Sequence, residues 1–109
     1  MDGDMGDSRR EESAAMKIVW SPRAIQHLVK LRNYIARDSD QNANVVAQRI
    51  VGAVSLLSTQ PEIVRPGRVL GTRELVIPHT PYVAPYRVRK GRVEVIAIFH
   101  GHQMWPKKL

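Results

Sequence analysis

Two arginines and two histidines in the last third of the chain carry the groups that RNA cleavage requires. Arg73 and Arg87 bring permanent positive charge, and His100 and His102 follow in a His-Gly-His segment. A guanidinium group binds phosphate, and a histidine moves protons near neutral pH. An aromatic ring such as that of Trp105 stacks on a base. If the fold brings them to one face, Arg73, Arg87, His100 and His102 form the catalytic residues of a candidate ribonuclease.

The same residues also have structural explanations. Arg73 stands next to Glu74 and can belong to a surface ion-pair network, and Trp105 can close the bottom of the core, because most buried tryptophans serve packing. His100 and His102 are a weak metal motif, since the sequence has no cysteine and no obvious third ligand. We therefore expect no metal and no cofactor.

Other catalytic classes lack their motifs. No Gly-x-Ser-x-Gly elbow indicates a serine hydrolase, and no glycine-rich loop is spaced to hold a nucleotide phosphate. The absence of cysteine excludes thiolate chemistry and disulfide bonds. The remaining functional side chains are basic, histidine and aromatic ones.

The charge of the chain indicates an acidic partner. The 109 residues include 17 Lys and Arg against 10 Asp and Glu, a formal net charge of +7. Residues 1–15 are polar and acidic, and we expect them to be a disordered extension. The rest, residues 16–109, has 15 basic and 5 acidic residues and is expected to form a single domain. Such a surplus attracts anionic macromolecules.

Hydrophobic periodicity predicts the elements that position these side chains. Residues 16–20 alternate as a short strand. Ser21-Pro22 is typical of a helix start, because the hydroxyl caps free N–H groups and proline needs no donor at the first helical position. Apolar residues then recur at helical spacing over residues 24–35 and 43–57. We expect these two helices to form an antiparallel hairpin, since a short turn joins them.

The second half of the chain has the pattern of strands. Residues 72–77, 82–89 and 92–100 are rich in Val, Ile and Tyr, and Lys90-Gly91 forms a two-residue hairpin turn. Pro85 inside the middle strand predicts an edge or a bulge. The predicted fold is α+β, in the order β-α-α-β-β-β. A small antiparallel sheet carries the helical hairpin on one face and leaves the other open.

The order of short motifs resembles that of the RelE/ParE superfamily of toxins. The resemblance covers residues 16–106 and depends on the sequence of the pieces rather than on any one of them. They include Trp20-Ser21-Pro22, Gly71-Thr72-Arg73-Glu74-Leu75, Tyr86-Arg87-Val88 and His100-Gly101-x-Gln103-x-Trp105-Pro106. The predicted fold agrees with that of the superfamily.

The resemblance implies the toxin of a type II toxin-antitoxin system that arrests growth. Its partner would be a cognate acidic antitoxin, partly disordered, that wraps across the toxin. We expect the target or antitoxin contacts at Arg23, Arg32, Arg37, Arg73 and Trp105. A cytoplasmic location is expected, without contact with a membrane.

Members of the superfamily have two kinds of target. RelE-like toxins cleave mRNA on the ribosome, and ParE-like toxins inhibit DNA gyrase without cleaving nucleic acid. Glu74, Val76 and Val83 stand where the nucleases have basic residues, and His102 stands near a late arginine. The resemblance therefore favours gyrase as the target. Ribosome-dependent mRNA cleavage is the alternative, and a basic nucleic-acid-binding module is a third.

Overall fold

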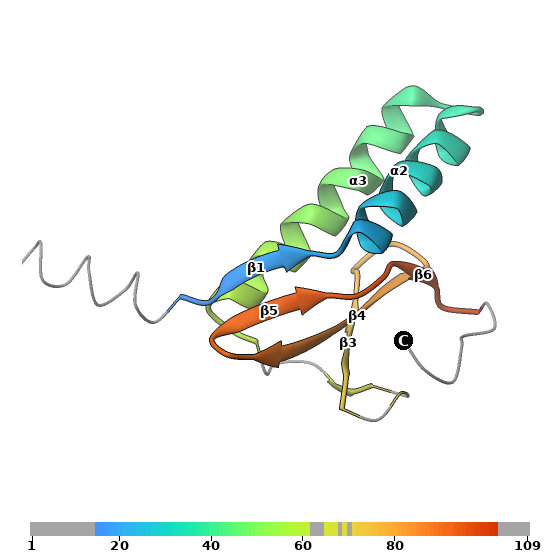
Figure 1. Cartoon of the computed structure of the whole chain (residues 1–109). Coiled ribbons are helices and arrows are strands. Elements are labelled where there is room, and N and C mark those ends of the chain that lie inside the picture. Colours follow the sequence, from blue (N-terminus) through green and yellow to red (C-terminus); the bar gives the residue numbers. More distant parts are fainter. Residues whose placement is uncertain (1–14, 62–64, 68, 70, 103–109) are drawn as a thin grey trace, which may run out of the picture.

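The computed structural model describes residues 15–61, 65–67, 69 and 71–102 (Figure 1). Its elements are β1 (Lys17–Trp20), α2 (Pro22–Ala36), α3 (Asp40–Ser55), the 3₁₀ turn η1 (Leu56–Ser58), β2 (Arg65–Pro66), β3 (Arg73–Val76), β4 (Tyr82–Arg89), β5 (Arg92–Val95) and β6 (Phe99–His100). None of the described helices is both long and apolar enough to cross a membrane.

The two helices begin at hydroxyl caps, of which the one at Ser21 was predicted. The Ser21 hydroxyl oxygen accepts a hydrogen bond from the Ala24 N–H at 3.0 Å, with Pro22 at the first helical position. Ser39 caps α3 in the same way, accepting from the Asn42 N–H at 3.1 Å. The helices lie side by side as a hairpin (Figure 1). The α+β class and the helical hairpin of the prediction are confirmed.

The strands form a mixed sheet in the order β1-β5-β4-β3-β2, with β6 also paired to β4. Every pair is antiparallel except β1 with β5, where Lys17 to Trp20 run parallel to Arg92 to Val95. The expectation of a wholly antiparallel sheet is wrong for this pair. The chain between β1 and β5 contains the helices and the other long strands, and a parallel pair requires such a long connection.

The predicted strand over residues 92–100 is broken in two, and the break lies opposite Pro85. Pro85 and Ile96 face each other as a hydrogen-bonded pair: the Ile96 N–H donates to the Pro85 carbonyl at 2.9 Å. The return bond cannot form, because proline has no N–H. The Ser21 hydroxyl donates to the Ile96 carbonyl instead, at 2.8 Å. The Ser21 N–H also donates to the Val95 carbonyl at 3.0 Å, so Ser21 joins the β1–α2 junction to the end of β5.

The core lies between the helices and one face of the sheet. Tyr86 on the central strand β4 is fully buried, and its hydroxyl donates to the Pro61 carbonyl. The side chains packed with it come from both helices and from β3, β4 and β5, including Ile50, Val54, Leu57, Leu75, Val93 and Val95. Since side chains alternate along a strand, the residues between them point to the other side of the sheet, called the open face below.

Replacing Ser21 with alanine removes both the helix cap and the hydrogen bond to Ile96. We expect the free energy of unfolding to fall by about 1.5–3 kcal/mol, since a cap contributes about 1 kcal/mol and an unsatisfied, partly buried carbonyl costs about as much again. Chemical denaturation followed by circular dichroism measures it. Ser39→Ala is the matched control, because Ser39 caps its helix without a second bond. Equal losses in the two variants would contradict the bridging role of Ser21.

Candidate functional site

Arg73 and Arg87, expected to meet, lie on opposite faces of the sheet. Arg73 is the register partner of Tyr86, whose ring is buried under the helices. Arg73 therefore shares the helix-facing side, whereas Arg87, one residue beyond Tyr86 on the same strand, points to the open face. The predicted convergence of these two arginines is wrong, because the register of β3 with β4 directs their side chains to opposite faces of the sheet.

The histidines form a cluster of their own at the other end of β4. The His100 ring lies edge-on to the Tyr82 ring at 5.9 Å and 5.7 Å from the His102 ring, and the His102 N–H donates to His100 Nδ1 at 3.2 Å. Tyr82 is five residues from Arg87, about 16 Å along an extended strand. Hence the four predicted catalytic residues do not form one site. Trp105 lies outside the described residues.

Arginines gather around Glu94 on the open face. One oxygen of the Glu94 carboxylate accepts hydrogen bonds from Arg87 Nε at 3.0 Å and Arg89 Nε at 2.9 Å. Removal of water raises the pKa of this carboxyl, but the hydrogen bonds and charges of the two arginines outweigh that effect and hold the pKa below its ordinary value. Glu94 therefore stays ionised at neutral pH and orients both arginine side chains.

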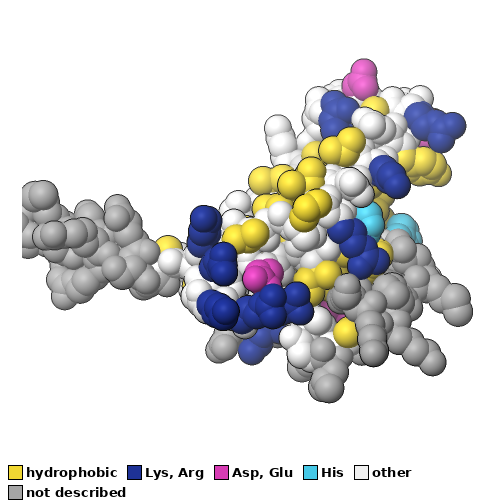
Figure 2. All heavy atoms as spheres, in the orientation of Figure 1, with side chains coloured by type: hydrophobic (Ala, Val, Ile, Leu, Met, Phe, Trp, Pro, Cys, Tyr) yellow, Lys and Arg dark blue, Asp and Glu magenta, His cyan; other side chains and the backbone are white. Residues whose placement is uncertain are grey.

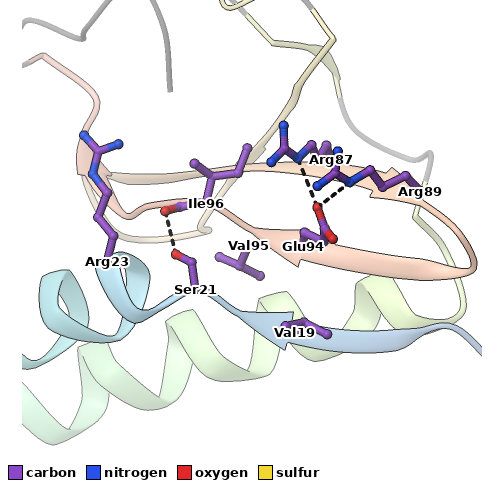
Figure 3. A pocket seen from close by; sticks show the side chains of 8 residues that line it. All are labelled: Val19, Ser21, Arg23, Arg87, Arg89, Glu94, Val95 and Ile96. Carbon is purple, nitrogen blue, oxygen red and sulfur yellow. Dashed lines mark hydrogen bonds and ion pairs between the residues drawn. The ribbon is translucent and has the colours of Figure 1, made fainter.

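A hollow of about 410 Å³ lies beside this cluster and is called the basic groove below. Figure 3 shows Arg23 from the start of α2 on one side and Arg87 and Arg89 on the other. The groove is completed by Val19, Ser21, Glu94, Val95 and Ile96. The Arg23 guanidinium lies 5.4 Å from the centroid of the Phe99 ring, within the range of a cation–π interaction.

A second hollow of about 410 Å³ lies between α2 and β6 and is called the aromatic pocket below. Its lining is rich in rings and consists of His27, Lys30, Leu31, Tyr34, Tyr82, Ile98, Phe99 and His100. It holds His100 but none of the predicted arginines. No group of three or more potential metal ligands occurs among the described residues.

His27 connects α2 to the segment before β6. Its Nδ1 accepts a hydrogen bond from the Ile98 N–H at 3.2 Å, and its ring packs against Phe99 at 5.3 Å. Burial, together with the charges of Arg23 and Lys30, lowers the pKa of His27 below 6.5. An Nδ1 that accepts a hydrogen bond carries no proton, so the ring is neutral in this arrangement.

The outer surface of the helical hairpin carries the remaining predicted contacts. Arg32 donates to the Asn44 side-chain oxygen at 2.8 Å, across the two helices. Arg37 follows α2, with its guanidinium 5.8 Å from the Tyr34 ring. Apolar side chains are also exposed on the two helices and at the start of η1, namely Ile25, Val29, Tyr34, Val51 and Leu56. Figure 2 shows such apolar side chains along the hairpin, with basic ones next to them.

Sequence patterns pointed to Arg23 and Arg87 but not to Arg89, Glu94 or His27. The signal for Arg89 and Glu94 was present, because the Lys90-Gly91 turn fixes the hairpin register and brings Arg87 opposite Glu94. His27 gave no such signal. A single histidine on a helix shows its role only when the segment packed against it is known.

His27 makes stability depend on pH. Because the fold lowers its pKa, the unfolded chain takes up this proton first as the pH falls. The stabilisation from neutral His27 is present above pH 6.5 and is lost as the pH falls through that value and then through the lower folded pKa. The free energy of unfolding should therefore decrease between neutral and mildly acidic pH.

Urea denaturation at a series of pH values measures this dependence. His27→Gln is the matched comparison, because its side-chain oxygen can still accept from the Ile98 N–H but does not titrate in this range. A flatter pH dependence in this variant is expected. If the free energy of unfolding changed with pH equally in both proteins, groups other than His27 would cause the loss of stability.

Comparison with known proteins identifies the family. The family model described as the ParE toxin of the type II toxin-antitoxin system parDE matches residues 18–105. The chain is 41% identical over 93 residues to the Y4kP protein of Sinorhizobium fredii, covering 85% of this chain and 96% of that protein. It is 32% identical over 88 residues to the toxin RelE2 of Caulobacter vibrioides, covering 81% of this chain and 98% of that toxin.

Solved structures share the fold. A chain of the chromosomal ParDE toxin-antitoxin system from P. aeruginosa superposes with a TM-score of 0.73 at 26% identity, covering 80% of this chain and 97% of that one. A chain of the RelBE2 toxin-antitoxin complex from Mycobacterium tuberculosis has a TM-score of 0.54 at 20% identity, covering 79% and 91%, and shows the fold alone. The match of the family model over most of the domain shows that this chain belongs to the ParE toxin family of type II toxin-antitoxin systems, within the RelE/ParE superfamily.

Proposed function

We propose that this protein arrests bacterial growth by inhibiting DNA gyrase and that a cognate acidic antitoxin neutralises it. The observation that carries the choice of target is that, among the described strands, the positions aligned with basic residues of the nucleases hold no basic side chain. Glu74, Val76 and Val83, at the positions aligned with basic residues of the nucleases, share the open face by register. Glu74 is buried, and the other two are apolar.

The separation of the predicted catalytic residues points the same way. Arg73 and Arg87 lie on opposite faces, and His100 lies at the far end of β4 from Arg87. Phosphodiester cleavage requires positive charge aimed at the phosphate and a proton donor or acceptor within hydrogen-bond reach of the same atoms. A site split in this way would lose orders of magnitude in rate, so inhibition by binding is the more consistent activity.

The helical hairpin has the properties of the antitoxin interface. Its exposed apolar side chains, Ile25 and Val29 among them, supply the hydrophobic contacts that dominate affinity, and Tyr34 borders the aromatic pocket beside them. Arg32 and Arg37 add positive charge that steers an acidic partner. The similar P. aeruginosa chain comes from a toxin-antitoxin system, which supports a protein partner of this kind.

Induced expression and a supercoiling assay test the proposal. Expression of the chain alone should stop growth, and co-expression of a small acidic protein encoded beside it should restore growth. Purified toxin should prevent gyrase from supercoiling relaxed plasmid, and toxin saturated with antitoxin is the control that should not. Normal supercoiling at a large excess of toxin would exclude gyrase as the target. Expression without growth arrest would leave only a nucleic-acid-binding module.

One observation favours the alternative, a ribosome-dependent endonuclease. The His100 ring contacts both the Tyr82 ring and the His102 ring, a cluster that could transfer protons, and the chain is similar to a toxin named RelE2. Primer extension on mRNA after induction should then show cuts at the ribosomal A site that disappear in His102→Ala. His79→Ala is the matched control, because His79 lies in the exposed turn between β3 and β4. The proposed gyrase activity predicts no such cuts.

A further inference from the structure

The open face carries a concentration of positive charge that antitoxin binding at the helical hairpin does not use. On β1, β4 and β5 its side chains include Lys17, Arg87, Arg89 and Arg92, and the acid among them is Glu94. Arg23 from α2 adds a further cation at the edge of the basic groove. Figure 2 shows dark blue side chains gathered around an acidic one over this part of the sheet.

Glu94 organises this surface without neutralising it. Its hydrogen bonds to Arg87 and Arg89 use the Nε atoms, at 3.0 and 2.9 Å, so the terminal nitrogens of both guanidinium groups are left to meet another acceptor. Figure 3 shows both side chains directed to the same oxygen of the carboxylate. Guanidinium groups held in one orientation lose less entropy when they bind an anion, and their fork matches phosphate oxygens.

The spacing of the charges fits a regular polyanion. Arg87 and Arg89 are alternate residues of one strand, so their Cα atoms are about 6.6 Å apart. Arg89 is the register partner of Arg92, which in turn is the register partner of Lys17 on β1. The positive charges therefore continue across three adjacent strands instead of surrounding one point. A single small anion would contact only part of this surface.

The surroundings favour a nucleic-acid backbone over an acidic protein segment. A protein partner needs apolar anchors, and the large hydrophobic side chains that are exposed in the described chain lie on the helices, in η1 and at Val76 of β3. The groove lining contains no aromatic ring on which an unpaired base could stack. A groove that offers charge, with neither an exposed large hydrophobic side chain nor an aromatic ring in its lining, suits the outside of a duplex.

We propose that the basic groove, together with Lys17 and Arg92, binds the phosphate backbone of a nucleic-acid duplex without reading its sequence. The contact is made by the terminal nitrogens of Arg87 and Arg89, with Arg23 at one end and Lys17 at the other. This surface is separate from the outer side of the helical hairpin. The toxin can therefore hold a duplex and an antitoxin on different faces.

Fluorescence anisotropy with a short DNA duplex of random sequence tests the proposal on the full chain. Binding should weaken as salt rises, with log K falling by about 0.9 per phosphate contact for each unit of log salt concentration. At about 0.1 M salt, where the Debye length is about 10 Å, the double variant Arg87→Gln and Arg89→Gln should bind at least about tenfold more weakly. It should also lower the slope of log K against log salt by about 2. Arg32→Gln with Arg37→Gln, on the helical hairpin, removes equal charge. This variant should change the affinity by no more than about twofold and leave the salt slope unchanged, because exposed charges beyond a Debye length are screened.

A second pair of variants keeps the test valid if loss of the Glu94 bonds unfolds the protein. Lys17→Gln with Arg92→Gln changes two exposed residues of the same surface and should also lower the slope by about 2. The proposal would be overturned if both double variants, Arg87/Arg89 and Lys17/Arg92, kept the wild-type slope of log K against log salt. Displacement of the duplex by polyglutamate of equal charge at equal concentration would also overturn it, since this would indicate an acidic protein segment as the ligand.

The outcome is independent of the proposed function. If the duplex does not bind but growth arrest and gyrase inhibition occur, only the nucleic-acid contact is wrong. If the duplex binds as described while expression leaves growth unaffected, the toxin function is wrong and the basic surface remains.

Discussion

The hydroxyl of Ser21 makes the interaction on which the arrangement of the sheet depends. Pro85 sits in the central strand and cannot donate to Ile96, so the ladder between β4 and β5 would leave a carbonyl without its partner. Ser21 supplies the missing donor at 2.8 Å and caps α2 with the same oxygen. One side chain thereby fixes the start of the helical hairpin, the edge strand β1 and the end of β5 relative to each other. The basic groove lies at this junction, because Ser21 and Ile96 are part of its lining.

The two proposed kinds of recognition fall on two different surfaces of the molecule. The hairpin presents apolar side chains with basic ones beside them, as a protein partner requires. The open face of β1, β5 and β4 presents arginine and lysine with Glu94 between them. This division follows from strand alternation. The apolar residues of β5, Val93 and Val95, are used for the core, so the residues between and before them are left to solvent and can be charged.

The sequence predicted the features that depend on local chemistry. Ser21-Pro22 marked the start of the first helix, and Lys90-Gly91 marked the hairpin turn, where Lys90 and Gly91 have positive φ of 54° and 71°. It did not predict which way β1 runs, because alternation in a short strand carries no information about direction. The same limit explains the error at Arg73. Its face depends on the register of β3 with β4 across residues 77–81, and a shift by one residue would have reversed it.

The parallel pairing of β1 with β5 also has a consequence for synthesis of the protein. Ser21 and Ile96 are 75 positions apart, so the edge of the sheet closes only after almost the whole domain has left the ribosome. A nascent chain that stops before β5 has the helical hairpin but lacks the strand that holds β1 in place. Folding of this toxin is therefore a late event in translation, controlled by contacts that are distant along the chain. A truncated product would have neither the complete sheet nor the arginine-lined hollow beside it.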